Sequence, residues 1–451
     1  MRYPLSFAQE WFLTLDRGDD GGAFGPRFLQ VCPVRVAGRV DVQMLQGALD
    51  DVVERHELLR TLVVRDADPP YQLVRPPCQV QLDVRDVAPV TGSSRDELVQ
   101  DLIAEAEAGT VSAREVPLLR AQLCRLDERD SVLILMVHHS ASDAWSVQVI
   151  LRDLGTFYAA RAAGVAADLP PAKQYHEYAQ WQRANAADPG EGGSLSFWRH
   201  NLDGTHEFGA PNDHGHPDSY SQPYSYHAHV IEADIMTGVS ALATATRSTQ
   251  FMIMLSAFYV LASQLTGETD LAIRAFTAGR DDLQFQDTMG LFINVLPFRA
   301  SLDDCVSFRD VITRARDTFI EAVTHELPVN VVEQAVPGFT STRQDRRTSE
   351  FIISMMQGQY GDELAVPIAD GAYVVAERPS QESGRHDIPS GMVWNLAAGP
   401  SGVLDGGVLY NLDEFDESTV VGWAAELRRI LAGVVSDPDQ DWRKLTSTGP
   451  T

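Results

Sequence analysis

The sequence predicts an α/β fold that is divided into two domains. At 451 residues the chain is longer than one ordinary hydrophobic core accommodates, which suggests two domains of roughly 200 residues each. Apolar runs of strand length alternate along the chain with longer stretches of helical periodicity. A loose, Pro- and Gly-rich region between about Asp168 and Ser194 is typical of a domain boundary.

The first half contains a predicted helix, a strand and a second helix. The first helix is expected over about Asp41–His56, because Asp41 is a suitable N-cap and apolar residues then recur on one face. Ser131–Val137 is an apolar run with β-branched residues, which predicts a buried strand. A helical pattern begins near Trp145.

The second half repeats the alternation of helices and strands. A strongly apolar helix is expected over about Gln250–Leu265, followed by a strand at Asp270–Phe276. Residues 407–411 are typical of another strand, and the amphipathic stretch Glu417–Val434 predicts a closing helix. We therefore expect a first domain at 1–180, a linker region at 181–205 and a second domain at 206–451.

Composition excludes several functional classes. The net charge of −27 argues against a general nucleic-acid or anionic-membrane surface, so we expect neither partner. The four cysteines are scattered without metal-type spacing, which predicts no metal site and buried thiols in a reducing cytoplasm. Neither a signal peptide nor an apolar stretch long enough to span a bilayer is evident. The sequence thus predicts a soluble cytoplasmic protein.

Two adjacent histidines, His138 and His139, follow the predicted strand directly. A strand end is a common place for a rigid scaffold to present a catalytic group, and an imidazole can move protons near neutral pH. Acid–base or acyl-transfer chemistry is the resulting hypothesis. Asp143 lies just before the next helix, so capping that helix is its simplest role.

The sequence from His138 to Ser146 resembles the HHxxxDG core of condensation domains from nonribosomal peptide synthetases. Further segments match the motifs of that family in the same order along the chain. These are Leu5–Leu13, Arg55–Thr61, Tyr175–Gln182, Ala278–Arg280, Met289–Pro297, His325–Pro328, Arg385–Ile388 and Tyr410–Asn411. The resemblance covers essentially the whole chain.

The resemblance implies a pseudo-dimer of two chloramphenicol-acetyltransferase-like subdomains, with the active site in a tunnel between them. It implies a donor thioester on the phosphopantetheine arm of a peptidyl or acyl carrier protein, and no permanently bound cofactor. The acceptor is a small molecule or a second carrier-bound group. We expect a monomer. The chain begins at the first motif and stops after the last helix, so we expect a free-standing enzyme, with an excised domain as the alternative.

The resemblance also implies roles for individual residues. His139 is the expected base or proton-positioning group. His138 is expected to be structural, since successive strand residues face opposite sides. In the family an arginine holds the aspartate that corresponds to Asp143, which supports the histidine loop. Arg60 is the first candidate for that arginine and Arg280 the second.

Ala144 is a departure, because the family has glycine after the aspartate. Alanine keeps an N–H that is able to donate to a developing oxyanion, but it adds a Cβ beside the substrate. The alanine is consistent with variation that the family tolerates, and equally with an altered position of the acceptor. Trp145 and Ser146 match the usual continuation, and Asn294 lies in a motif; all three are candidates to line the substrate tunnel.

Two other functions fit part of the pattern. An acyl-CoA-dependent acyltransferase uses the same HxxxD chemistry. A catalytically silent recruitment module has the same fold, although such modules typically have a degraded histidine motif. The sequence leaves open the donor, the acceptor, and whether the new bond is an amide or an ester.

Overall fold

The computed structural model describes residues 1–87, 94–186, 193–217, 224–280, 282–341, 345–356, 366–374, 391–398 and 402–445. The chain forms two compact units. Unit 1 comprises Met1–Ala187, Ala278–Ile293 and Gln359–Ile388, and unit 2 comprises Asp188–Thr277, Asn294–Gly358 and Pro389–Thr451. The motif segment Arg385–Ile388 lies outside the described residues.

The units are not two contiguous halves of the chain. The predicted linker at 181–205 contains the first passage from unit 1 to unit 2, but the prediction placed all of 206–451 in the second domain. Instead, two later segments belong to unit 1. Residues 371–374 pair as a strand with residues 34–37, and Met289 is buried in the core of unit 1. Contacts with an existing sheet and core, which no local pattern encodes, decide this placement.

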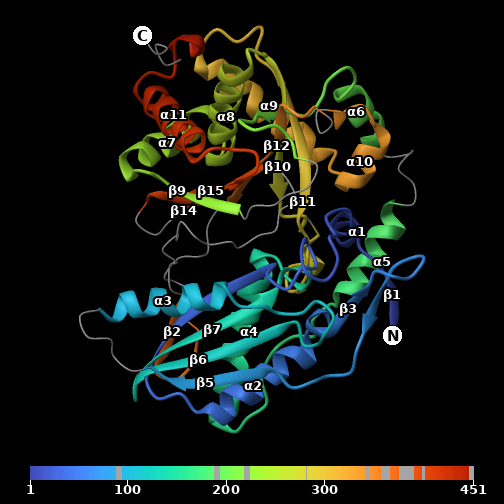
Figure 1. Ribbon diagram of the computed structural model, residues 1–451, viewed down its shortest axis with the longest axis vertical. Helices are drawn as coiled ribbons and strands as arrows, with labels where there is room; N and C mark the ends of the chain where they lie inside the picture. The colour runs from blue at the N-terminus through green and yellow to red at the C-terminus, as the bar shows by residue number, and fades with distance from the viewer. Residues whose placement is uncertain are drawn as a thin grey trace. The chain divides into compact units, whose positions relative to one another are not determined.

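Unit 1 is built on a 5-stranded sheet among the described residues, with helices on both faces (Figure 1). Its strand order is β13 (Gly371–Val374), β2 (Leu29–Ala37), β7 (Asp130–His138), β6 (Leu119–Asp127), β5 (Gln81–Asp86). Helices α2 (Val42–Arg55) and α4 (Ala144–Ala163) share a core with one face, and α3 (Arg95–Glu107) shares a core with the other.

The remaining elements of unit 1 are short. They are a 3-stranded sheet of β1 (Arg2–Pro4), β4 (Tyr71–Val74) and β3 (Thr61–Val64), helices α1 (Phe7–Thr14) and α5 (Tyr175–Ala186), and the 3-10 turns η1 (Glu57–Arg60), η2 (His139–Ala141) and η3 (Leu283–Phe285).

The continuous apolar sequence of the central strand β7 follows from its position in the sheet. Leu133, Leu135 and Val137 pack in the core with α2 and α4, whereas Val132 and Ile134 pack in the core with α3. A strand covered on both faces needs apolar residues at every position, which is why this run is continuous rather than alternating. The predicted strand is confirmed, and it ends at the double histidine.

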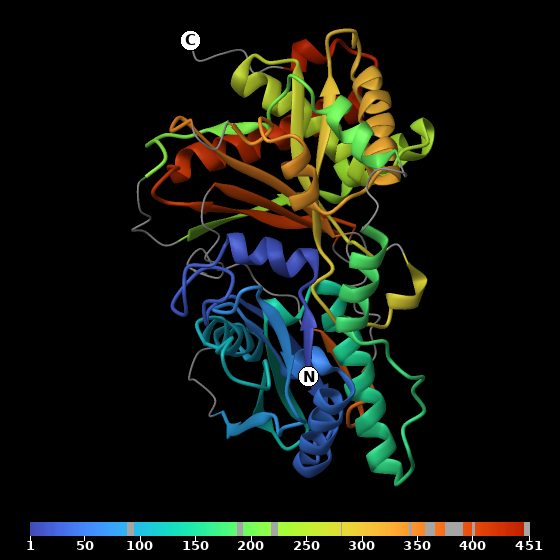
Figure 2. The same cartoon turned by 90° about the vertical axis from the view of Figure 1, so that its right-hand side faces the viewer.

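Unit 2 has a larger mixed sheet with helices packed against it (Figure 2). The main strand order is β11 (Asn294–Ser301), β10 (Asp270–Thr277), β12 (Thr348–Met356), β14 (Met392–Ala398), β15 (Leu404–Asn411), β9 (Tyr224–Ile231), and β8 (Gly209–Pro211) pairs with β12. Its helices are α6 (Ser194–Asn201), α7 (Ala233–Thr246), α8 (Gln250–Thr266), α9 (Phe308–Thr324), α10 (Val329–Ala335) and α11 (Glu417–Ser436), and a last 3-10 turn, η5, spans Trp442–Leu445.

The predicted helices are confirmed, together with the residues that begin and end them. The Asp41 side chain accepts hydrogen bonds from the backbone N–H groups of Gln43 and Met44 at the start of α2. Helix α8 is capped by Thr249 and ends at Gly267, which is in the left-handed conformation. Together with the strands, these helices confirm the predicted α/β fold class.

Membrane-spanning potential is low in the described residues. No single helix there is both long and apolar enough to cross a membrane, whereas α7 and α8, bent by 103° at their junction, pass the length and composition criteria only as a pair.

Candidate active site

His138, at the end of β7, is a fully buried structural residue. Its Nε2 lies 3.0 Å from the carbonyl oxygen of Gly25, and its Nδ1 lies 3.1 Å from the backbone N–H of Ser140. Because the carbonyl must accept and the N–H must donate, the ring is the neutral tautomer with the proton on Nε2. Burial lowers its pKa to about 4, so this ring stays neutral near pH 7. Its predicted structural role agrees with this geometry.

His139 begins the 3-10 turn η2 and lies among aromatic rings. Its ring stacks on Phe28 with a centroid distance of 4.7 Å and an interplanar angle of 17°, and it meets Phe12 edge-on at 5.9 Å. Its backbone N–H donates to the carbonyl of Phe28 at 2.8 Å. The residue as a whole is only partly buried. Burial lowers the pKa of His139, with Asp143 acting in the opposite direction.

Asp143 is the central acceptor of the loop, and both of its predicted roles occur together. Its Oδ1 accepts from the backbone N–H of Ser146 at 2.7 Å, which caps α4. Both carboxylate oxygens also lie 3.0 Å from Nη2 of Arg280. The N–H of Phe292 donates to Oδ2 at 3.2 Å. One buried carboxylate thus joins the histidine loop, the helix start and segment 278–293.

Arg280, the second of the two candidates, is the arginine that holds Asp143. Its Nη1 donates to the carbonyls of Thr288 at 2.8 Å and Phe285 at 3.1 Å. Its guanidinium carbon lies 3.8 Å from the centroid of the Phe292 ring, a cation–π contact. Both terminal nitrogens of this buried guanidinium are hydrogen-bonded, which offsets the cost of burying its charge.

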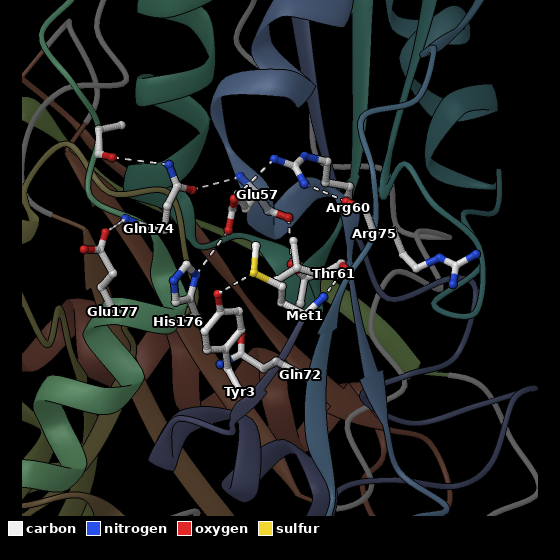
Figure 3. A network of polar contacts seen from close by, with 12 residues as sticks. Met1, Tyr3, Glu57, Arg60, Thr61, Gln72, Arg75, Gln174, His176 and Glu177 are labelled. Carbon is white, nitrogen blue, oxygen red and sulfur yellow. Dashed lines mark hydrogen bonds and ion pairs between the residues drawn. The ribbon is translucent and has the colours of Figure 1, made fainter.

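The first candidate, Arg60, does not contact Asp143, and that prediction was wrong. Arg60 donates to the carbonyl of Arg75 at 2.6 Å and lies 3.4 Å from Glu57 (Figure 3). Glu57 in turn lies 3.2 Å from His176 in the same network. Arg60 follows α2 by only a few residues, so its side chain reaches the carbonyls at the end of that helix rather than the histidine loop.

Ser146 and Trp145 support the loop and segment 278–293. The Ser146 hydroxyl is fully buried and lies 2.7 Å from Asp143 Oδ1, and it accepts from the N–H of Gly290 at 2.9 Å. The indole N–H of Trp145 donates to the carbonyl of Gln286 at 2.8 Å, while 38% of the residue stays exposed. The predicted contact of either side chain with substrate stays a prediction, as does the tunnel.

Asn294, the first residue of β11, belongs to unit 2. Its amide nitrogen donates to Glu326 at 2.8 Å and to the carbonyl of Leu327 at 2.9 Å, and its amide oxygen accepts from the N–H of Val329 at 2.9 Å. These bonds tie the start of β11 to the turn before α10. They favour a structural role over the predicted lining role.

Tyr175 and Phe28 are site residues that sequence reasoning did not single out. The Tyr175 hydroxyl is 2.7 Å from Ser6 and also donates to the carbonyl of Leu291. Ser6, Tyr175 and Leu291 each lie in a different matched motif, and that coincidence was an available signal. Phe28 lies in none of them, and no local pattern marks it.

Gly279 sets the path of the segment that carries Arg280. Its φ is +58°, and an added Cβ would lie 1.9 Å from the carbonyl oxygen of Phe292. Gly164, with a φ of +68°, has nothing within 4 Å of the same position. We expect Gly279→Ala to lower the free energy of unfolding by about 2–4 kcal/mol, against about 1 kcal/mol for Gly164→Ala. Urea denaturation of both variants measures the difference, and equal losses would contradict a packing requirement at Gly279.

The cluster is suited to proton transfer. In the part of the chain that the structure describes, no three His, Cys, Asp or Glu side chains are grouped so as to bind a metal ion. The imidazole of His139, whose pKa is lowered by burial, stands on a loop whose carboxylate, that of Asp143, is buried and hydrogen-bonded. Such a site is able to accept one proton from an incoming nucleophile.

Comparisons with known proteins agree with the motif array. The model of the condensation domain matches residues 1–451. The chain is 33% identical over 447 residues to the probable non-canonical nonribosomal peptide synthetase CymA of Salinispora arenicola. It is 32% identical over 464 residues to the dimodular nonribosomal peptide synthase of Bacillus subtilis. These alignments cover 96% and 100% of the chain but only 6% and 19% of those relatives.

A solved structure matches along its whole length. The SgcC5 protein from Streptomyces globisporus, crystallised with (R)-(-)-1-(2-naphthyl)-1,2-ethanediol and sucrose, is 35% identical and superposes with a TM-score of 0.90. The match covers 97% of this chain and 100% of that protein. With the fold, the ordered motifs and the full-length family match in agreement, the chain belongs to the condensation domain family.

Proposed function

We propose that this protein condenses an acyl or aminoacyl thioester, carried on the phosphopantetheine arm of a carrier protein, with an amine or alcohol acceptor. The product is an amide or an ester. The observation that carries the proposal is the complete HHxxxD loop, held by the buried bonds of Asp143 to Arg280, Ser146 and Phe292.

The reaction needs positioning and one proton transfer, because a thioester is already activated. The acceptor lone pair attacks the carbonyl carbon while the acceptor proton passes to the neutral imidazole of His139. The tetrahedral intermediate collapses with cleavage of the C–S bond, and His139 returns the proton to the departing sulfur. The new amide or ester and the free pantetheine thiol leave, so protons and electrons balance without a cofactor.

An alcohol acceptor has specific support. The SgcC5 protein, which is 35% identical, was crystallised with an aryl 1,2-ethanediol. An alcohol is far less acidic than an α-ammonium group, whose pKa is roughly 8, so it depends more strongly on a general base. We therefore propose a hydroxyl acceptor first and an amine second.

The pH dependence of ester formation tests the state of His139. Burial lowers its pKa below the ordinary value of 6.5, so the neutral form persists as the pH falls through 6.5. Besides burial, the groups that bear on this ring are Asp143, the backbone of His139 and Ser142, the neighbouring His138 and, through Asp143, Arg280. We expect the acidic limb of kcat/KM for an alcohol acceptor to have its midpoint below pH 6.5. Half-loss at or above pH 6.5 would contradict a lowered pKa.

Acid stability must be followed in the same series. His138 has a folded pKa of about 4 against 6.5 unfolded, so the unfolded state binds more protons between these values. The free energy of unfolding therefore falls as the pH drops from 6.5 toward 4. Circular dichroism at each pH separates this loss of fold from protonation of the base.

The decisive assay mixes the protein with a carrier protein loaded with a set of acyl and aminoacyl groups. Amines and 1,2-diols are offered as acceptors, and products are identified by mass spectrometry. Acyl-CoA and N-acetylcysteamine thioesters are tested in parallel. Product from the carrier-bound donor supports the proposal, and efficient turnover of acyl-CoA favours the acyltransferase alternative. Binding of the loaded carrier without product would identify a recruitment module.

A further inference from the structure

The start of strand β2 lies directly against the histidine loop. In the antiparallel pairing of β2 with β7, Leu29 is opposite His138 and Gln30 is opposite Val137. Phe28, one residue earlier, supports His139 through both its carbonyl and its ring. The same short piece of strand therefore underlies the loop on which the proposed base stands.

Gln30 contacts the far end of that loop through its side-chain amide. With the amide nitrogen facing the loop hydroxyl, it lies 2.5 Å from Ser142 Oγ and 3.2 Å from the carbonyl of Asp143. The amide oxygen then accepts from the N–H of Ala144 at 3.3 Å. One side chain thus bridges three consecutive residues. None of the family motifs in this sequence includes Gln30.

Each of these contacts meets a real requirement of the loop. Ser142 is fully buried, so its hydroxyl would be left without this partner if Gln30 were apolar. Ala144 is the first residue of α4, where backbone N–H groups have no acceptor within the helix. The carbonyl of Asp143 accepts from Val147 at 3.3 Å to open the helix, and Gln30 fixes the orientation of that same peptide.

We propose that Gln30 is a positioning residue of the active site, which holds the Ser142–Ala144 peptides and thereby sets the orientation of the loop that carries His139. This inference rests on the proposed condensation activity. It also gives the N–H of Ala144 an acceptor outside the loop, on strand β2. Gln30 acts through the loop and does not take part in proton transfer itself.

Gln30→Met tests the role, because methionine keeps the length of the side chain and removes its hydrogen bonds. We expect kcat to fall about 10- to 100-fold, since small displacements of a catalytic group have large effects on rate. The KM for the acceptor should change less than about threefold, because the loop orientation rather than the binding surface is altered.

Gln46→Met is the matched control. Gln46 is a half-buried glutamine of unit 1 whose amide donates to Asp50 and to the carbonyl of Val80, both at 3.0 Å. Both substitutions remove the hydrogen bonds of one half-buried glutamine, so their thermal stabilities should fall by similar amounts. A fall in kcat confined to Gln30→Met therefore reports on the loop and not on general loss of stability.

Gln30→Glu provides a second measurement, the pH dependence of kcat/KM, which a purely structural role of Gln30 would not change. A carboxylate still accepts from Ala144 but places a negative charge beside the loop, which favours the charged form of His139. The groups already acting on His139 are Asp143, the backbone of His139 and Ser142, the neighbouring His138 and, through Asp143, Arg280, and this variant replaces none of these residues. We expect the acidic limb of the kcat/KM profile to move to higher pH, and Gln46→Glu to leave it in place.

The outcomes separate this inference from the proposed function. If the wild type forms product and Gln30→Met keeps kcat within about twofold, the positioning role is overturned. If the wild type forms no product with any donor or acceptor, the proposed function fails. NMR resonances of the His139 ring, assigned with His139→Ala, then decide on Gln30 without turnover: unchanged ring resonances in a folded Gln30→Met variant reject the positioning role, and a shift that Gln46→Met does not produce supports it.

Discussion

Replacing His139 by alanine is expected to reduce condensation by about 10²- to 10⁴-fold while leaving the protein folded, which is the range that loss of a general base produces. The backbone bond from residue 139 to the carbonyl of Phe28 does not involve the imidazole, so it supports the loop in the variant as well. The measurement is the initial rate of product formation with a saturating loaded carrier, and near-ultraviolet circular dichroism monitors the aromatic surroundings.

His214→Ala is the matched control for loss of an imidazole. His214 lies in unit 2, is about half exposed and pairs with Asp416 at 3.0 Å. Its removal should leave the rate within about twofold of the wild type. If His139→Ala retained a tenth or more of the wild-type rate, the base assignment would be wrong, and positioning of the acceptor would become the main source of catalysis.

Replacing Arg280 by methionine is expected to have the largest effect on stability. Its side chain is 4% exposed and that of Asp143 is 5% exposed, so the variant leaves a buried carboxylate without its counterion. Breaking a buried pair in this way typically costs about 3–5 kcal/mol of unfolding free energy. Activity should also fall, because Asp143 caps α4 and anchors the loop through the same carboxylate.

Arg161→Met tests whether that loss reflects burial. Arg161, also in unit 1, pairs with Asp51, but the two side chains are 42% and 27% exposed. An exposed pair contributes about 0–1 kcal/mol, so this variant should unfold close to the wild-type denaturant concentration. Equal losses for both variants would contradict a special role for the Arg280–Asp143 pair. Asp143→Asn combined with Arg280→Met should be less destabilised than the sum of the single changes.

Local patterns were sufficient for the elements that carry the site. Helices α2 and α8 were predictable because their caps and apolar faces lie within a few residues of one another. Strand β7 was predictable because burial on both faces requires an uninterrupted apolar run. His138 was predictable as structural from strand alternation, and the ordered motifs identified the family.

Partners that are distant in sequence were not predictable in the same way. Arg60 and Arg280 both lie in matched motifs, 83 and 137 residues from Asp143 along the sequence. No local pattern indicates which of the two contacts Asp143. The answer depends on segment 278–293 returning to unit 1, which in turn needs the left-handed conformation of Gly279. Gln30 was missed because an isolated glutamine on a strand has no sequence signature.

By itself the sequence determined the α/β class, the position of the double histidine at a strand end, and the family, because these depend on short-range periodicity and on ordered motifs. Only the tertiary structure decided that Arg280 holds Asp143, that Asn294 belongs to a different unit, and that Gln30 and Phe28 support the loop. Those relations are set by which surfaces bury against each other when the chain returns to unit 1, and burial between distant segments leaves no local trace in a single sequence.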